Sequence, residues 1–110
     1  MIFIYIETNK NNFIKSIRIK GHAPLKEEYS IECSIVSALV DLLNLTFKEI
    51  YNHFRVSIIV KSGYFFMEIN EDKKENIDFI EKFLAPIIKM FYQISIQYKN
   101  VINFEIIKSN

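Results

Sequence analysis

Hydrophobic and polar residues follow one another along this chain in patterns that predict both strands and helices. Residues 1–7 are β-branched and aromatic, which is typical of a strand with both faces largely covered. The polar residues 8–12 then favour a turn. Residues 13–20 alternate between apolar and polar side chains. This alternation predicts a second strand that pairs back as a hairpin, keeps one solvated face and lies at or near an edge of the sheet.

Two longer segments repeat their apolar residues at helical spacing. Residues 31–51 carry a broad apolar stripe, which predicts a first amphipathic helix. A second helix is predicted to begin near Asn76, with its apolar stripe running from Ile77 to Ile94. Pro86 lies inside this stripe. Because proline removes a helical hydrogen bond, we expect a kink near Leu84, or a split into two helices.

The remaining strands complete the predicted order. Residues 54–61 and 64–70 are strand-like and flank Ser62-Gly63, which is a specific signal for a hairpin turn. Residues 101–107 form the last predicted strand. The order ββαββαβ predicts an α+β fold, with a mostly antiparallel five-stranded sheet packed against two amphipathic helices.

Composition narrows the class of protein. A chain of 110 residues with 50% hydrophobic residues is sufficient for a single domain over residues 1–110. The 14 basic and 13 acidic residues nearly cancel, so no global attraction to nucleic acid or to a membrane surface is expected. A single cysteine excludes an internal disulfide and fits a reducing compartment. With no membrane-spanning run and no signal-peptide pattern, we expect a soluble, cytoplasmic protein.

Several kinds of site are disfavoured by the positions of the chemically active residues. Cys33, His22 and His53 are the only soft metal ligands, and they lack a metal-binding spacing, so we expect neither a metal nor another cofactor. His53 is interpreted as a cation at the end of the first helix. Gly21 and Gly63 are isolated, which disfavours a phosphate-binding loop. Aromatic residues are spread along the chain rather than clustered with Arg and Lys, so direct nucleic-acid binding is not expected.

Residues 21–37 contain the candidate chemistry. Ser30 is a favourable N-cap residue, which places Cys33 in the first turn of the following helix. A helix N-terminus stabilises a thiolate by only about 0.3–1 kcal/mol, so a reactive cysteine needs a second partner. His22, at the other end of a short loop, is the candidate partner. The alternatives are that Cys33 is an inert, buried, small hydrophobic side chain, or that glutamates of this stretch form a catalytic pair rather than a solvated loop and helix start.

The motifs of this stretch resemble those of a known family. Gly21-His22-Ala23, followed by Ile-Glu-Cys-Ser-Ile-Val-Ser-Ala-Leu at residues 31–39, is similar to the ribosomal-processing cysteine protease family, Prp, and the similarity extends over the whole chain. The resemblance implies an endopeptidase that trims the N-terminal extension of a large-subunit ribosomal protein, and it suggests a homodimer. It implies that Cys33 is the nucleophile and that His22 is its general base and later acid, with supporting positions at Gly21, Ser30 and Ser37.

The same stretch departs from the pattern of the Prp family at specific positions. Ser30 stands where the family has an acidic residue, and Glu32 stands where it has an apolar one. The interval between His22 and Cys33 is also shorter. Two functions therefore stay open from the sequence: a cysteine endopeptidase, or a catalytically impaired Prp-like protein that binds a ribosomal protein or an assembly intermediate. The pH dependence of Cys33 alkylation distinguishes them.

Overall fold

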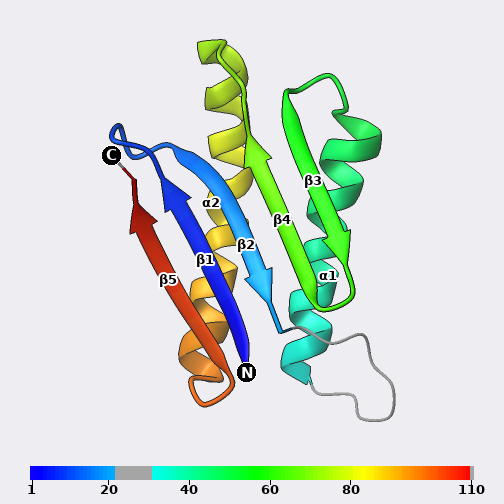
Figure 1. The fold of residues 1–110 in the computed structure, drawn as a ribbon, viewed down its shortest axis with the longest axis vertical. Helices are drawn as coiled ribbons and strands as arrows, with labels where there is room; N and C mark the ends of the chain where they lie inside the picture. Colours follow the sequence, from blue (N-terminus) through cyan, green and yellow to red (C-terminus); the bar gives the residue numbers. More distant parts are fainter. Residues whose placement is uncertain (22–30, 110) are drawn as a thin grey trace.

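The computed structural model describes residues 1–21 and 31–109 of the chain. Within these ranges the predicted order of strands and helices is confirmed, and the fold is α+β (Figure 1). The elements are β1 (Ile2–Thr8), β2 (Ile14–Lys20), α1 (Ile31–Leu45), the π-helical turn η1 (Thr46–Ile50), β3 (Val56–Lys61), β4 (Tyr64–Ile69), α2 (Lys74–Gln97) and β5 (Ile102–Lys108).

The five strands form one sheet in the order β3-β4-β2-β1-β5. β1 and β5 are parallel, whereas the other three pairs of neighbouring strands are antiparallel. The mostly antiparallel sheet is therefore confirmed. The prediction that residues 13–20 form a strand at or near the edge is wrong, because β2 is the central strand and pairs with both β1 and β4. Its alternation of apolar and polar residues reflects an open face of the sheet, not an open edge.

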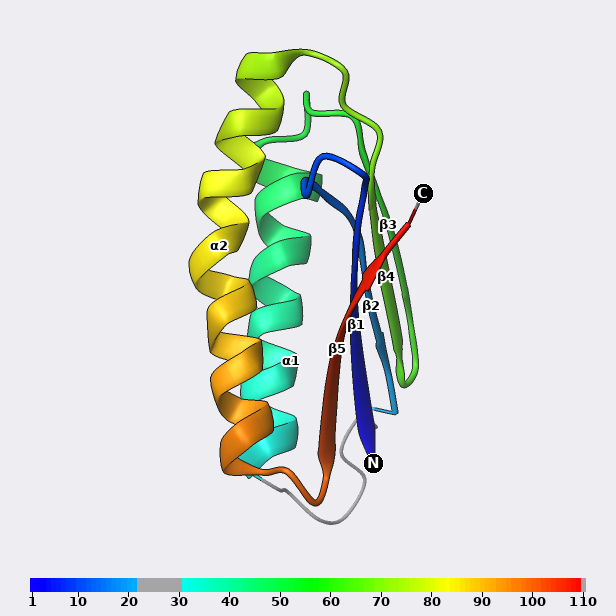
Figure 2. The same cartoon turned by 90° about the vertical axis from the view of Figure 1, so that its left-hand side faces the viewer.

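Both helices cover the same face of the sheet (Figure 2). The isoleucines Ile4 and Ile6 of β1 point into this layer and are completely buried, together with Ile17 and Ile19 of β2. On the opposite face, which we call the outer face, the described residues form no helix. The prediction that both faces of the first strand are largely covered is therefore wrong, since its alternate side chains on the outer face remain only half-buried.

The first helix ends in an unusual turn. α1 stops at Leu45, and η1 continues it with wider, π-helical hydrogen bonding, so that the Tyr51 N–H donates to the Thr46 carbonyl at 2.7 Å. The buried Thr46 hydroxyl donates to the Leu42 carbonyl, also at 2.7 Å. The helix predicted over residues 31–51 is thus present, but its last turn has π-helical hydrogen bonding, next to the point where the Thr46 side chain bonds to the backbone.

The second helix runs without interruption from Lys74 to Gln97 and is not split at Pro86. Pro86 lies on the exposed side of the helix. The carbonyl that loses its helical partner belongs to Lys82, which is also exposed, so water can replace the missing donor. No helix within the described ranges is long and apolar enough to cross a membrane.

Glu81 joins the second helix to the sheet, and its environment makes stability depend on pH. Its Oε2 accepts a hydrogen bond from the Ile14 N–H at 3.0 Å. Desolvation raises the pKa of Glu81, the neighbouring Asp78 carboxylate raises it further, and the bond from Ile14 opposes both. The folded state therefore holds the Glu81 proton more tightly than the unfolded chain does, so ionisation costs stability.

We expect Glu81→Gln to remove this cost while keeping an acceptor for the Ile14 N–H. Since the pKa is raised in the folded state, the wild type should lose stability relative to the variant as the pH rises above 4.5, with the difference levelling off above the folded-state pKa. Urea unfolding at several pH values measures this difference. The expectation would be contradicted if the stability advantage of Glu81→Gln over the wild type were smallest at neutral pH.

Candidate active site

Cys33 occupies the first turn of α1, as the sequence predicts. It is half-buried, and its side chain packs against the hydrophobic core. The carboxylate of Glu32 lies in the same first turn. His22 and Ser30, the predicted partner and N-cap residue, lie outside the described residues. The position of the cysteine on the helix is therefore defined, and the pairing with His22 remains a prediction.

Gly21 ends the sheet immediately before His22, and its backbone requires glycine. Its φ of 88° lies in the left-handed region, and a Cβ at this position would collide with the carbonyl oxygen of Met1. The Gly21 N–H donates a hydrogen bond of 2.9 Å to the carbonyl of Gly63, in the turn between β3 and β4. Three segments of the chain thus fix the point at which the backbone leaves β2.

The start of α1, the end of β2 and the turn between β3 and β4 all lie at the same end of the molecule (Figure 1). A cavity of about 180 Å³ lies between α1 and this turn. Ser37 lines it and follows Cys33 by one helical turn on the same face of α1. The other lining residues are Val40, Asp41, Val60, Lys61, Ser62 and Gly63. The structure therefore places a small cleft along α1, and its lining begins one helical turn after Cys33.

Two charged residues of this cavity were not among the residues predicted from the sequence. Asp41 lies two helical turns after Cys33 on the same side of α1, so helical spacing alone could have predicted that it lies near the site. Lys61 lies at the end of β3, opposite Tyr64 of β4. Its place beside α1 depends on how the hairpin packs, and no local pattern in the sequence reveals it. Asp41 gives the cleft an acidic wall, whereas the Lys61 side chain, paired with Tyr64 and next to the inward-facing Val60, belongs to the outer face of the sheet.

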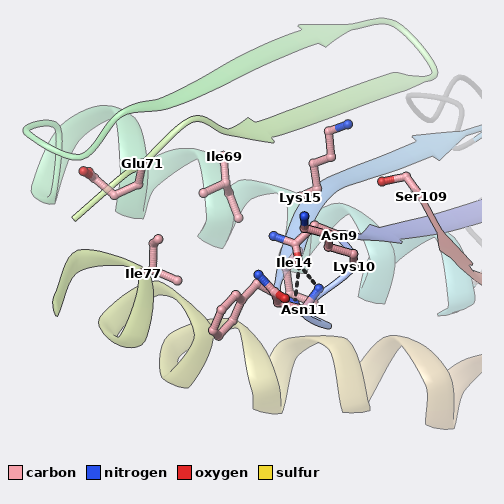
Figure 3. Close-up of a pocket in the computed structure, with 10 residues that line it drawn as sticks. Asn9, Lys10, Asn11, Ile14, Lys15, Ile69, Glu71, Ile77 and Ser109 are labelled. Atoms are coloured by element: carbon pink, nitrogen blue, oxygen red, sulfur yellow. Dashed lines mark hydrogen bonds between the residues drawn. The ribbon is translucent and has the colours of Figure 1, made fainter. Parts of the chain in front are cut away.

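A larger cavity, of about 370 Å³, lies at the opposite end of the sheet. It is bordered by the turn between β1 and β2, where the Asn9 side chain accepts hydrogen bonds from the N–H groups of Asn11 and Phe13 (Figure 3). Ile69, Glu71, Ile77 and Ser109 also line it. The hydrogen bond from the Arg55 N–H lowers the pKa of Glu71. Among its described lining residues there is no cysteine or histidine, and it lies at the end of the sheet opposite the start of α1.

His53 lies beyond the other end of the first helix. It is exposed, and its ring packs against Phe54 at 4.3 Å and Tyr51 at 6.3 Å between centroids. The structure therefore keeps His53 away from the end of the molecule where α1 begins. Among residues 1–21 and 31–109, no group of three or more His, Cys, Asp or Glu side chains is arranged to hold a metal ion.

A cysteine in a helix start, at the same end of the molecule as a strand-end glycine, agrees with the family suggested by the motifs. A model of the family described as cysteine protease Prp matches residues 1–103. The chain belongs to this family. Prp is a family of cysteine proteases, and the resemblance drawn from the Gly-His-Ala and cysteine segments is confirmed.

Solved structures share this fold over almost their whole length. SMU.848 from Streptococcus mutans superposes with a TM-score of 0.81 at 16% identity, covering 99% of both chains. The ribosomal processing protease Prp from Staphylococcus aureus, with a covalently linked product peptide, gives 0.73 at 19% identity, covering 99% of this chain and 100% of that one. The same protease with a substrate peptide gives 0.66 at 20% identity and the same coverage. A search of curated proteins gave no match.

Proposed function

We propose that this protein is a cysteine endopeptidase that removes the N-terminal extension from a large-subunit ribosomal protein in the cytoplasm. The observation that carries the proposal is the position of Cys33 in the first turn of α1, at the end of the molecule where β2 ends before His22. Membership of the Prp family and the fold shared with the S. aureus processing protease support it. The test is cleavage of the precursor ribosomal protein from the same organism by wild type and by Cys33→Ala.

The residue content of the chain and the position of His53 favour one catalytic pair. Cys33 is the only cysteine, so a cysteine-protease mechanism has one candidate nucleophile. The chain has two histidines. His53 follows η1, and at 1.5 Å per residue the part of α1 after Cys33 alone separates the two by more than about 18 Å. His22, which follows Gly21 directly, is therefore the proposed general base and acid.

The proposed reaction follows the chemistry of an activated thiol. The His22 imidazole takes the Cys33 proton, and the thiolate attacks the scissile carbonyl carbon. The tetrahedral intermediate collapses to a thioester when the imidazolium gives its proton to the leaving amine. His22 then takes a proton from water, whose oxygen attacks the thioester carbon. The C–S bond breaks, the imidazolium returns its proton to the sulfur, and the acid product leaves as a carboxylate after losing its proton to solvent. Backbone N–H groups in the first turn of α1 are the proposed donors to the oxyanion.

The edge strand β3 offers a place for an extended substrate. Among the described strands β3 has a neighbour on one side only, and its Ile59 and Val60 side chains are about half exposed, at 47% and 49%. Val60 and Lys61 also line the cleft that contains Ser37. We infer that the substrate peptide adds a strand beside β3, because backbone hydrogen bonding would carry an unstructured N-terminal extension towards Cys33.

The second function open from the sequence is binding without turnover, and Glu32 beside the cysteine is the observation that favours it. A like-charged neighbour opposes thiolate formation, whereas His22 favours it.

If the Cys33–His22 pair is active, iodoacetamide should modify Cys33 at about pH 6.5 at a substantial fraction of its rate at about pH 9. His22→Ala should remove most of the reactivity at the lower pH. Glu32→Gln is the matched variant. Alkylation that needs alkaline pH in the wild type supports the binding protein instead.

We also propose that the protein is a homodimer, with the second copy on the helical layer. An apolar cavity of about 510 Å³ lies between α1 and α2, lined by Leu39, Leu42, Lys82, Phe83, Pro86, Ile87 and Met90. Leu42 and Met90 are 41% and 44% exposed. Exposed apolar side chains at the rim of a groove are typical of protein interfaces.

Leu42→Glu should therefore shift the mass measured by analytical ultracentrifugation from that of a dimer to that of a monomer. Lys89→Glu is the control and should leave the mass unchanged. A Leu42→Glu variant that stays dimeric would exclude this groove as the interface.

A further inference from the structure

Strand pairing gathers aromatic and basic residues on the outer face of the sheet. Phe3 of β1 lies opposite Lys20 of β2, which in turn lies opposite Tyr64 of β4. Two residues further along β1, the next row across the same three strands consists of Tyr5, Arg18 and Phe66. In each row a cation stands between two aromatic rings. Lys61 of β3 extends the first row beyond Tyr64.

The four rings of these rows are only partly buried. Phe3 and Tyr5 lie parallel, with an interplanar angle of 4° and centroids 6.3 Å apart. Arg18 places its Cζ atom 5.0 Å from the centre of the Phe66 ring. All four rings of the two rows are half-buried, and neither α1 nor α2 covers this face (Figure 2). The partial exposure of these rings leaves aromatic surface that a ligand can contact.

Charge on the outer face is separated along the strands. Arg18, Lys20 and Lys61 lie towards the end of the molecule that contains Gly21. The next row, at the other end, contains Glu7, Ser16 and Glu68, with a hydrogen bond of 3.1 Å from Ser16 to Glu7. Glu105 of β5 flanks Tyr5. The basic half of the face is thus bounded by carboxylates, which confines an anionic ligand to the rows that carry the rings.

A hollow of about 330 Å³ lies across this boundary. Its lining residues are Tyr5, Glu7, Ser16, Arg18, Lys20 and Ile107. It offers an aromatic ring, hydrogen-bonding groups of both kinds and two cations. These are the groups that contact a nucleobase and its phosphate in proteins that bind single strands.

We propose that the outer face binds single-stranded nucleic acid, with bases stacked on Phe3, Tyr5 and Tyr64 and phosphates held by Arg18, Lys20 and Lys61. Open sheets with exposed aromatic residues bind unpaired bases in this way, because every base has a face that stacks. A protein partner is less well matched, since the rings are separated across the strands by cations rather than by aliphatic side chains. The expectation against nucleic-acid binding followed from the spread of the aromatic residues along the chain, a spread that strand pairing removes.

The test is fluorescence anisotropy with labelled oligonucleotides of about 12 nucleotides, as single-stranded RNA, as single-stranded DNA of the same sequence and as the duplex. At about 50 mM salt, the wild type should bind a single strand with a micromolar Kd and the duplex about tenfold more weakly or worse. Tyr5→Leu should weaken single-strand binding about tenfold. Lys20→Gln should reduce the slope of log K against log salt by about 0.7. Tighter binding of RNA than DNA would identify RNA as the ligand.

The matched controls are Tyr92→Leu and Lys89→Gln, which change exposed residues of α2 on the helical side. They should leave the affinity unchanged. Absence of single-strand binding at about 100 µM protein, equal binding of the duplex, or losses no larger than those of the controls would each overturn the proposal. A Tyr5→Leu variant that changes the mass in solution but not the oligonucleotide affinity would assign the face to a protein partner. Cys33→Ala should bind as the wild type does, so the result is independent of the peptidase.

Discussion

Replacing Cys33 with alanine should abolish removal of the N-terminal extension, lowering the cleavage rate by at least about 10⁴-fold. The thiol is the only group in the chain that can form the proposed thioester, and the chain has no second cysteine to take its place. The measurement is mass spectrometry of the precursor ribosomal protein after incubation with the purified variant. The folded state should persist, because Cys33 is only half-buried and its removal leaves a small space at the helix start.

Two further variants make this result specific. Lys89→Ala changes an exposed residue of α2, away from the start of α1, and should cleave at the wild-type rate. Cys33→Ser keeps the size of the side chain but replaces sulfur with a less acidic hydroxyl, so it should lose most of the activity. If Cys33→Ala trimmed the precursor at a rate close to that of Lys89→Ala, the peptidase assignment would fail and the binding function would remain.

Replacing Gly21 with alanine should destabilise the fold and weaken catalysis together. An alanine must adopt the left-handed φ of 88°, which costs about 1 kcal/mol. Its Cβ would also collide with the Met1 carbonyl, which cannot withdraw freely because the next residue, Ile2, is buried and donates its N–H to the Val101 carbonyl. We expect a total loss of about 2–4 kcal/mol in the free energy of unfolding, measured with urea.

Asn12→Ala separates the two causes of this loss. Asn12 also has a positive φ, of 65°, but it is exposed in the turn between β1 and β2. The variant should lose only about 1 kcal/mol and keep its activity. At temperatures where Gly21→Ala remains folded, its cleavage rate should still fall, because a shift of Gly21 moves the residue that follows it. Equal losses of stability in the two variants would show that the contact with Met1 does not constrain this end of the sheet.

The elements of this fold could be predicted because their signals are local. The spacing of apolar residues decides whether a segment between residues 31 and 51 becomes a helix, and Ser62-Gly63 decides that the flanking strands form a hairpin. The continuity of α2 through Pro86 could not be predicted in this way. It depends on which side of the helix faces solvent, and that follows from how the helix packs on the sheet.

For the candidate site, the sequence by itself determined that Cys33 opens a helix, that Gly21 and His22 follow a strand, and that Cys33 is the only thiol. These properties depend on chain order and helical period alone. Only the tertiary structure placed the turn at Gly63 against Gly21, β2 at the centre of the sheet and both helices on one face, which leaves the aromatic and basic rows of the outer face open. The physical reason is that strand pairing and helix docking join residues far apart in the chain. The periodicity within one segment does not predict which other segment it will pack against.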